Sequence, residues 1–244
     1  MYTKPTLFFS LAFVGISLLE MIGDTFSISW LHYGCKPLIM GLLLGYAWHH
    51  YRTTGFPPIS RWLMVGMVFA LLGDVFLMIR EVDLFALGLG AFLVMQLCYS
   101  KAFWLSIRRN GQNLTLPSIW KRALPFVLYL VIFLAVLRPA FVHNPALQLL
   151  WWPVVVYALC LNTMGLLAVL REGASAYGGV VAGALLFILS DSLIAIDKFL
   201  TPVPGATWLV MSTYAAAQYL IIVGMIQWVS MPENQPTSVE SVRS

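Results

Sequence analysis

The sequence predicts an all-α membrane protein, a polytopic bundle of about eight transmembrane helices with both termini in the cytoplasm. Of its 244 residues, 60% are hydrophobic and only 10% are charged. An average soluble domain is about 45–50% apolar and about 25% charged. Because a chain this apolar has too few polar side chains to cover a surface in water, most of its side chains must face lipid or one another.

About eight apolar segments are long enough to span a bilayer, which takes about 20 helical residues. Helix-breaking residues such as Pro57-Pro58, Pro139 and Asn144-Pro145 separate them, and no gap could hold another domain. We therefore expect one membrane domain over residues 1–230 and a polar, disordered tail over residues 231–244. The segments cover approximately residues 6–23, 34–50, 61–80, 84–105, 122–138, 148–171, 178–199 and 206–230.

Lys and Arg predict the orientation of these segments. With the N-terminus inside, ten of the 14 fall on the inner side, and four (Lys36, Arg80, Arg138 and Lys198) fall outside. Positive charge is retained on the cytoplasmic side, so both termini are expected there, in a bacterial inner membrane. The charges suit membrane lipid headgroups, and no nucleic-acid partner is expected. The sequence does not indicate an oligomeric state.

Cysteine and histidine positions do not suggest a metal or cofactor. No C-x-x-C pair and no helical H-E-x-x-H motif occurs. We expect buried, inert thiols and no metal. The cysteines lie far apart and the histidines fall near predicted membrane edges: Cys35, Cys98, Cys160, His32, His49, His50 and His143.

Two carboxylates lie deep within predicted spans, Asp74 in the third and Asp191 in the seventh. A charge at mid-span costs at least about 2.5–3.5 kcal/mol, and such residues usually face an internal cavity. Asp74 lies 13 residues after Arg61, and Asp191 lies 13 residues after Gly178. Each is then about 20 Å from the inner end of its helix. We predict that both are catalytic and converge on one cavity.

Further polar residues fall in or near the same layer and are candidates for substrate binding. Gln96 and Tyr99 share a helical face at i and i+3, as do Tyr214 and Gln218 at i and i+4. Taken singly, such residues are more often bonds between helices. The predicted substrate-binding residues are Glu20, Lys36, Gln96, Tyr99, Asn162, Ser190, Tyr214 and Gln218.

Other features are expected to be structural. Small residues such as Gly178, Gly179 and Gly183 allow helices to cross closely. Asp197 and Lys198 are expected to pair at the outer end of their span, and Glu81 is expected in a solvated loop.

Five stretches carry a resemblance to a known family. They are Cys35-Lys-Pro-Leu38, Leu71-Leu-Gly-Asp74, Leu89 to Tyr99, Gly183 to Ser192, and Tyr214 to Ile221. In their order, spread over spans two to eight, they are similar to the YhhN family, whose characterised members are lysoplasmalogenases. The resemblance implies cleavage of the vinyl ether bond of a lysophospholipid, giving a fatty aldehyde and glycerophosphoethanolamine or glycerophosphocholine.

This activity suits the two aspartates. A vinyl ether needs an acid to protonate carbon and an anion to steady the resulting cation or activate water. Two carboxyls in unequal environments can divide these roles, as they do in glycoside hydrolysis. We expect Asp74 and Asp191 to share them, Lys36 to hold the phosphate, and the remaining polar residues to place headgroup and water.

Three other interpretations stay open. Intramembrane carboxylates also mark the ion pathways of proton-coupled transporters, although no inverted repeat is evident. A metal-dependent hydrolase would need histidines beside the aspartates. A structural bundle would use the aspartates only to bond helices together.

Overall fold

Each predicted segment forms a long helix in the computed structural model, which describes residues 5–79, 81–111 and 114–229. The all-α prediction is confirmed, and the predicted tail over 231–244 lies outside the described residues, as does Arg80. The four-residue α6 was not predicted. In order, the helices are α1 (Leu7–Thr25), α2 (Ser29–Thr54), α3 (Pro58–Met78), α4 (Phe85–Arg109), α5 (Leu116–His143), α6 (Pro145–Gln148), α7 (Trp151–Val169), α8 (Tyr177–Phe199) and α9 (Ala206–Val229).

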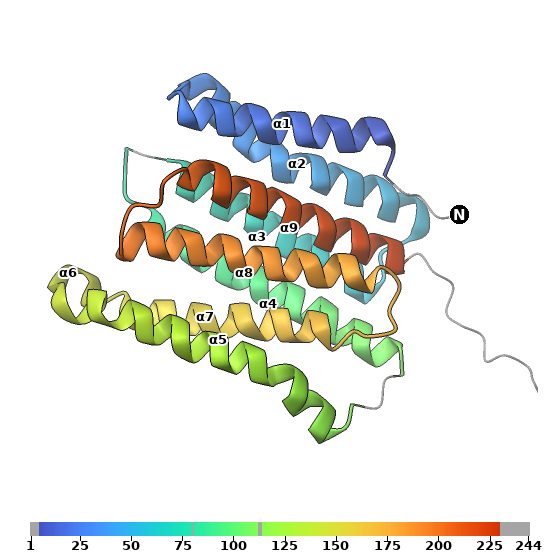
Figure 1. Ribbon diagram of the computed structural model, residues 1–244. Coiled ribbons are helices and arrows are strands. Elements are labelled where there is room, and N and C mark those ends of the chain that lie inside the picture. Colours follow the sequence, from blue (N-terminus) through green and yellow to red (C-terminus); the bar gives the residue numbers. More distant parts are fainter. Residues whose placement is uncertain (1–4, 80, 112–113, 230–244) are drawn as a thin grey trace, which may run out of the picture.

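The chain is a multi-pass membrane protein, since seven helices within the described ranges are long and apolar enough to cross a bilayer. The remaining long helix, α2, has 26 residues but is less apolar, because it carries His32, Lys36, His50 and Arg52. It packs against α1 and α3. The start of α1 and the end of α9 lie at the same end of the bundle (Figure 1). Which side of the membrane this end faces stays a prediction.

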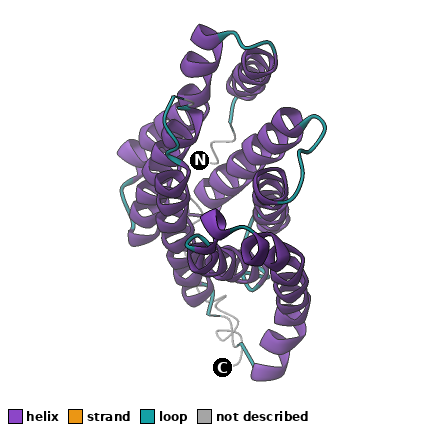
Figure 2. Cartoon of the chain, turned by 90° about the vertical axis from the view of Figure 1, so that its left-hand side faces the viewer, coloured by secondary structure: helices purple, strands orange, loops and turns teal. Residues whose placement is uncertain are grey.

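Five helices form a closed ring of contacts. Following the ring, α3 packs on α4, α4 on α7, α7 on α8, α8 on α9, and α9 returns to α3. The α1–α2 hairpin packs on one side of this ring, and α5 packs on α7 and α8 at the other (Figures 1 and 2). Of the seven apolar spans, α9 is the most buried, so its polar side chains lie within the protein.

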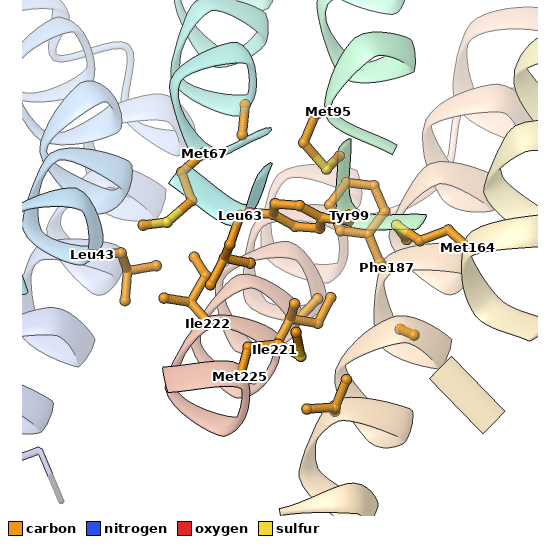
Figure 3. Packing of buried hydrophobic residues seen from close by; sticks show 14 of the residues in the cluster. Leu43, Leu63, Met67, Met95, Tyr99, Met164, Phe187, Ile221, Ile222 and Met225 are labelled. Atoms are coloured by element: carbon orange, nitrogen blue, oxygen red, sulfur yellow. The ribbon is translucent and has the colours of Figure 1, made fainter. Parts of the chain in front are cut away.

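Methionine and aromatic side chains fill the space inside the ring. Met67, Met95, Tyr99, Met164 and Phe187 are all fully buried and gather there from four different helices (Figure 3). Lipid tails are as apolar as these side chains, so the gain from burial is mainly close packing. The unbranched methionine side chains can fill irregular gaps between the aromatic side chains.

Two helix backbones pack closely where α8 crosses α9. A Cβ atom added to Gly183 would lie 2.9 Å from the carbonyl oxygen of Ala217 and 3.0 Å from the backbone nitrogen of Ile221. The predicted close crossing is therefore confirmed at Gly183. It is wrong for Gly178 and Gly179, beside which a Cβ would meet nothing within 4 Å.

Two local predictions are wrong. Pro139 does not end a helix but lies inside α5, as does Pro125. Membrane helices tolerate proline because neighbouring groups and local adjustments satisfy the freed backbone. Lys198 does not pair with Asp197: its Nζ lies 3.9 Å from Asp83 Oδ2. Asp197 instead accepts a hydrogen bond from the Val203 backbone N–H, at 2.8 Å.

Gly183→Ala should destabilise the protein by about 1–3 kcal/mol, the usual cost of forcing an extra methyl into a packed core. The matched control is Gly179→Ala on the same helix, which adds a methyl in open space. Thermal unfolding in detergent micelles compares the two variants with the wild type. Equal melting temperatures for both variants would contradict the close crossing of α8 and α9.

Candidate functional site

Asp74 lies at the end of a chain of buried hydrogen bonds that crosses the ring. Tyr99 Oη on α4 donates to Gln218 Oε1 on α9 at 2.9 Å. The Gln218 Nε2 amide donates to Tyr214 Oη at 3.5 Å, and Tyr214 Oη donates to Asp74 Oδ2 at 2.7 Å. Every donor in the chain points toward the carboxyl, an arrangement in which the bonds polarise one another.

Glycines on α3 make room for this arrangement. A Cβ added to Gly66 would lie 2.6 Å from the ring of Tyr99, and one added to Gly73 would lie 2.7 Å from the ring of Phe92. Gly66 and Gly73 are two helical turns apart and so lie on one face of α3. The rings of α4 can therefore approach the α3 backbone beside Asp74.

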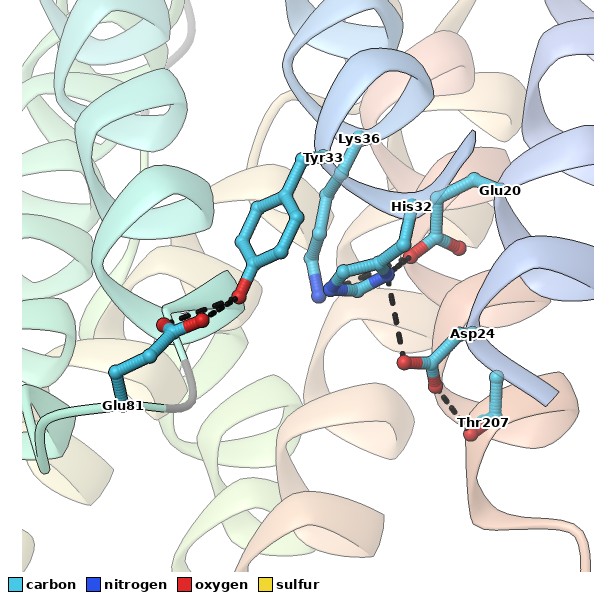
Figure 4. A network of polar contacts seen from close by, with 7 residues as sticks. All are labelled: Glu20, Asp24, His32, Tyr33, Lys36, Glu81 and Thr207. Atoms are coloured by element: carbon cyan, nitrogen blue, oxygen red, sulfur yellow. Dashed lines mark hydrogen bonds and ion pairs between the residues drawn. The ribbon is translucent and has the colours of Figure 1, made fainter. Parts of the chain in front are cut away.

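A second polar cluster adjoins Asp74 from the α1–α2 hairpin. His32 Nδ1 lies 3.2 Å from Glu20 Oε1 and 3.3 Å from Asp24 Oδ1. Lys36 Nζ lies 3.9 Å from the same Glu20 oxygen, and Thr207 Oγ1 donates to Asp24 Oδ2 at 2.6 Å (Figure 4). The charges of Lys36 and Glu20 act on the Asp74 carboxyl. The hairpin therefore adds charged groups to the surroundings of Asp74, which are otherwise determined by its burial and its hydrogen bond from Tyr214.

Asp191 lies in a different environment. Tyr157 Oη on α7 donates to Asp191 Oδ2 at 2.6 Å. This carboxyl lines a narrow cavity of about 50 Å³ whose other walls are mostly aliphatic and aromatic side chains of α3, α4, α5, α7 and α8. Beside Asp191, Ser192 Oγ and Tyr129 Oη share a hydrogen bond of 2.6 Å.

Three aromatic rings link the surroundings of the two aspartates. Phe92, Phe187 and Tyr214 contact one another with ring centroids 5.8–6.2 Å apart. Phe92 lines the cavity of Asp191, whereas Tyr214 is bonded to Asp74. Asp74 does not line the Asp191 cavity. The prediction that both aspartates converge on one cavity is therefore wrong for the Asp191 cavity: Asp74 adjoins this aromatic layer at Tyr214, and Asp191 adjoins it at the cavity wall formed by Phe92.

Asp74 and Asp191 lie at similar depths along the bundle. Asp74 lies 16 residues into α3, counted from Pro58, and Asp191 lies 14 residues into α8, counted from Tyr177. The difference corresponds to about 3 Å along the axis. Both carboxyls therefore lie in the half of the bundle that ends at the α1–α2 and α3–α4 loops.

Three other predicted residues lie near Asp191 or between helices. Gln96 is fully buried beside the Tyr157 hydroxyl, although neither of its amide atoms makes a hydrogen bond within the described structure. Asn162 lines the Asp191 cavity and donates to the Ala158 carbonyl. Ser190 donates to the Val210 carbonyl and joins α8 to α9. Gln96 and Asn162 thus belong with Asp191, and Ser190 serves helix packing.

His32, Asp24 and Tyr157 are site residues that were not predicted from the sequence. His32 was assigned to a membrane edge, yet it is buried, at 4% exposure, between two carboxylates. A signal was present in the sequence: Glu20 and Asp24 are four residues apart, as are His32 and Lys36. Two such pairs flanking a short turn face each other when the helices form a hairpin.

Comparison with known proteins agrees with the resemblance noted from the sequence. The model of the YhhN family matches residues 31–225. Lysoplasmalogenase TMEM86A of Bos taurus is 34% identical over 176 residues, which cover 70% of this chain and 67% of that protein. Lysoplasmalogenase TMEM86B of Homo sapiens is 31% identical over 200 residues, covering 82% and 77%.

A bacterial relative gives a similar result. The lysoplasmalogenase of Mycobacterium bovis is 30% identical over 182 residues, which cover 74% of this chain and 66% of that protein. No solved structure gives a significant match. The resemblance is confirmed by a family match over most of the chain: this protein belongs to the YhhN family.

Proposed function

We propose that this protein hydrolyses the vinyl ether bond of lysoplasmalogens, with Asp74 and Asp191 as the two acid–base groups. Relatives at 30–34% identity carry the name lysoplasmalogenase. The observation that carries the proposal for this chain is a pair of tyrosine-bonded carboxyls that adjoin one aromatic layer, Asp74 at Tyr214 and Asp191 at the cavity lined by Phe92. A reacting bond held within that layer would lie near both carboxyls.

The reaction needs one proton donor and one group that activates water. A carboxylic acid gives its proton to the vinyl carbon that is not bonded to oxygen, and the carbon next to oxygen becomes an oxocarbenium centre. Water adds there after losing a proton to a carboxylate, and a hemiacetal results. The C–O bond of the hemiacetal to glycerol then breaks: the glycerol oxygen takes the proton that the second carboxyl removed from water, the hemiacetal hydroxyl returns its proton to the first carboxyl, and the aldehyde is released. One water is consumed and both carboxyls return to their starting states.

The polarity of the protein matches that of a lysophospholipid. On one side of the aromatic layer lie Asp74, Lys36 and the charged α1–α2 cluster. On the other side lies the narrow apolar cavity that ends at Asp191. With its headgroup on the first side and the first carbons of its alkenyl chain in the cavity, a lysoplasmalogen would place its ether bond beside Phe92, and the rest of the chain would follow apolar helix faces toward lipid. The Phe92 ring must turn aside to admit it.

The remaining polar residues have supporting roles in this proposal. Lys36 supplies the positive charge for the phosphate, with the Glu20 carboxylate holding its ammonium group in place. Gln218 and Tyr99 fix the orientation of the Tyr214 hydroxyl, which donates to Asp74. On the apolar side, Tyr157 orients Asp191, with Gln96 beside it.

Asp74→Asn and Asp191→Asn should each lower the rate of fatty aldehyde release from lysoplasmenylcholine at least about a hundredfold, because general acid–base groups contribute about 10²–10⁴-fold. Release is measured with purified protein in detergent. Asp197→Asn is the control, since Asp197 is exposed on the same helix as Asp191. A folded Asp74→Asn or Asp191→Asn variant with the wild-type rate would refute its role.

Tyr214→Phe should lower kcat because it removes the hydrogen bond to Asp74. Bonds to charged groups contribute about 1.5–3 kcal/mol, which corresponds to about a ten- to hundredfold loss. Tyr219→Phe is the matched control: it lies on the same helix, and its hydroxyl bonds Ser10 outside the site, at 2.6 Å. Equal losses of kcat in the two variants would show that Tyr214 has no specific role in the reaction.

A further inference from the structure

A separate pocket of about 110 Å³ opens where the α1–α2 turn meets the loop after α3. Its lining residues are Gly23, Ser27, Ser29, His32, Tyr33 and Glu81. Unlike the Asp191 cavity, this pocket is lined largely by polar groups. Among its lining residues, Glu81 is the one carboxylate and Tyr33 the one phenol. Neither has a part in the chemistry proposed above.

Tyr33 and Glu81 are held together across the pocket. Tyr33 Oη donates to both Glu81 oxygens, at 2.9 and 3.1 Å. In Figure 4, the Tyr33 ring lies between Lys36 on one side and Glu81 on the other. A carboxylate beside an aromatic ring attracts ammonium and quaternary ammonium groups. The carboxylate attracts them by its charge, and the ring attracts them by its negative face. From the sequence alone, Glu81 is expected only in a solvated loop.

The order of charges along this surface matches a zwitterionic headgroup. Lys36, whose charge acts on Asp74, lies next to the pocket and carries positive charge. Glu81, on the far side of Tyr33, carries negative charge. Phosphate and ammonium follow each other in the same order in phosphoethanolamine and phosphocholine.

The length of a lysophospholipid headgroup is also compatible with this arrangement of residues. Asp74 lies one turn, about 6 Å, before the end of α3 at Met78, and Glu81 lies in the loop that follows. Roughly nine bonds separate the ether oxygen of a lysoplasmalogen from its headgroup nitrogen, as many as in three residues of extended chain, which span about 10 Å. A headgroup that extends about 10 Å from an ether oxygen beside Asp74 would therefore pass the end of α3 and enter the loop that holds Glu81.

We propose that Glu81 and Tyr33 form the binding site for the ammonium group of the lysophospholipid headgroup. This inference rests on the proposed function for the identity of the substrate. Such a site would make the protein bind ethanolamine and choline lipids in preference to lipids whose headgroup carries no positive charge. Ser27 and Ser29, in the turn between α1 and α2, line the same pocket.

The test is Glu81→Gln, which removes the charge but leaves an amide oxygen able to accept the Tyr33 hydrogen bond. Its KM for lysoplasmenylcholine should rise about tenfold, the effect of losing one charge contact. Its KM for alkenyl-glycerophosphate, which has no ammonium group, should change less than about twofold. Asp83→Asn is the matched control, with the same charge change two residues along the loop. Equal KM increases for both substrates, or no increase for either, would overturn the ammonium site.

A binding measurement separates this proposal from the proposed reaction. Calorimetric titration of glycerophosphocholine into protein in maltoside micelles should show binding to the wild type that is about tenfold weaker in Glu81→Gln. Tyr33→Phe keeps the ring and should retain most of the affinity. If the wild type binds glycerophosphocholine more tightly than Glu81→Gln does but releases no aldehyde, the proposed reaction is refuted and the ammonium site is not. If glycerophosphocholine binds both proteins equally, or neither, the ammonium site is refuted even in an active enzyme.

Discussion

The interior of this protein is organised around the need to satisfy two carboxyl groups away from water. An unpaired charge inside a bilayer is costly, and each aspartate meets this cost with a tyrosine hydroxyl from a neighbouring helix. Tyr214 reaches Asp74 across the junction of α9 and α3, and Tyr157 reaches Asp191 across the junction of α7 and α8. Both bonds therefore also join neighbouring helices of the ring. The polar groups on which the proposed chemistry depends are part of what holds the bundle together.

The aromatic layer gives the two carboxyls unequal surroundings. On one side, Asp74 is influenced by Lys36 and Glu20 and is connected to a polarised chain of hydrogen bonds. On the other side, Asp191 faces a cavity of mostly apolar side chains. Paired carboxyls in unlike environments can take different roles in one reaction. Here the two environments meet at Phe92, Phe187 and Tyr214, which come from three different helices.

The α1–α2 hairpin extends this site toward the surface. Buried His32 connects the carboxylates of Glu20 and Asp24, and Lys36 connects the same cluster to Asp74. The concentration of polar groups explains why α2 is the least apolar of the long helices. A lysophospholipid bound along this line would pass from charged to apolar surroundings, as its own structure passes from headgroup to chain.

Composition and the spacing of apolar segments determined the membrane class, the number of long helices and the presence of two deep carboxyls. These follow from the sequence because a bilayer imposes the length and apolarity of each span locally. Pairs within one helix, such as Tyr214 and Gln218, were likewise predictable from their spacing. Only the tertiary structure decided which faces meet. It placed Gln96 beside Tyr157, buried His32 between Glu20 and Asp24, and linked the surroundings of Asp74 and Asp191 through an aromatic layer. Helical periodicity gives the depth of a residue but not the rotation of its helix against its neighbours, and that rotation comes from side-chain packing between segments far apart in the chain.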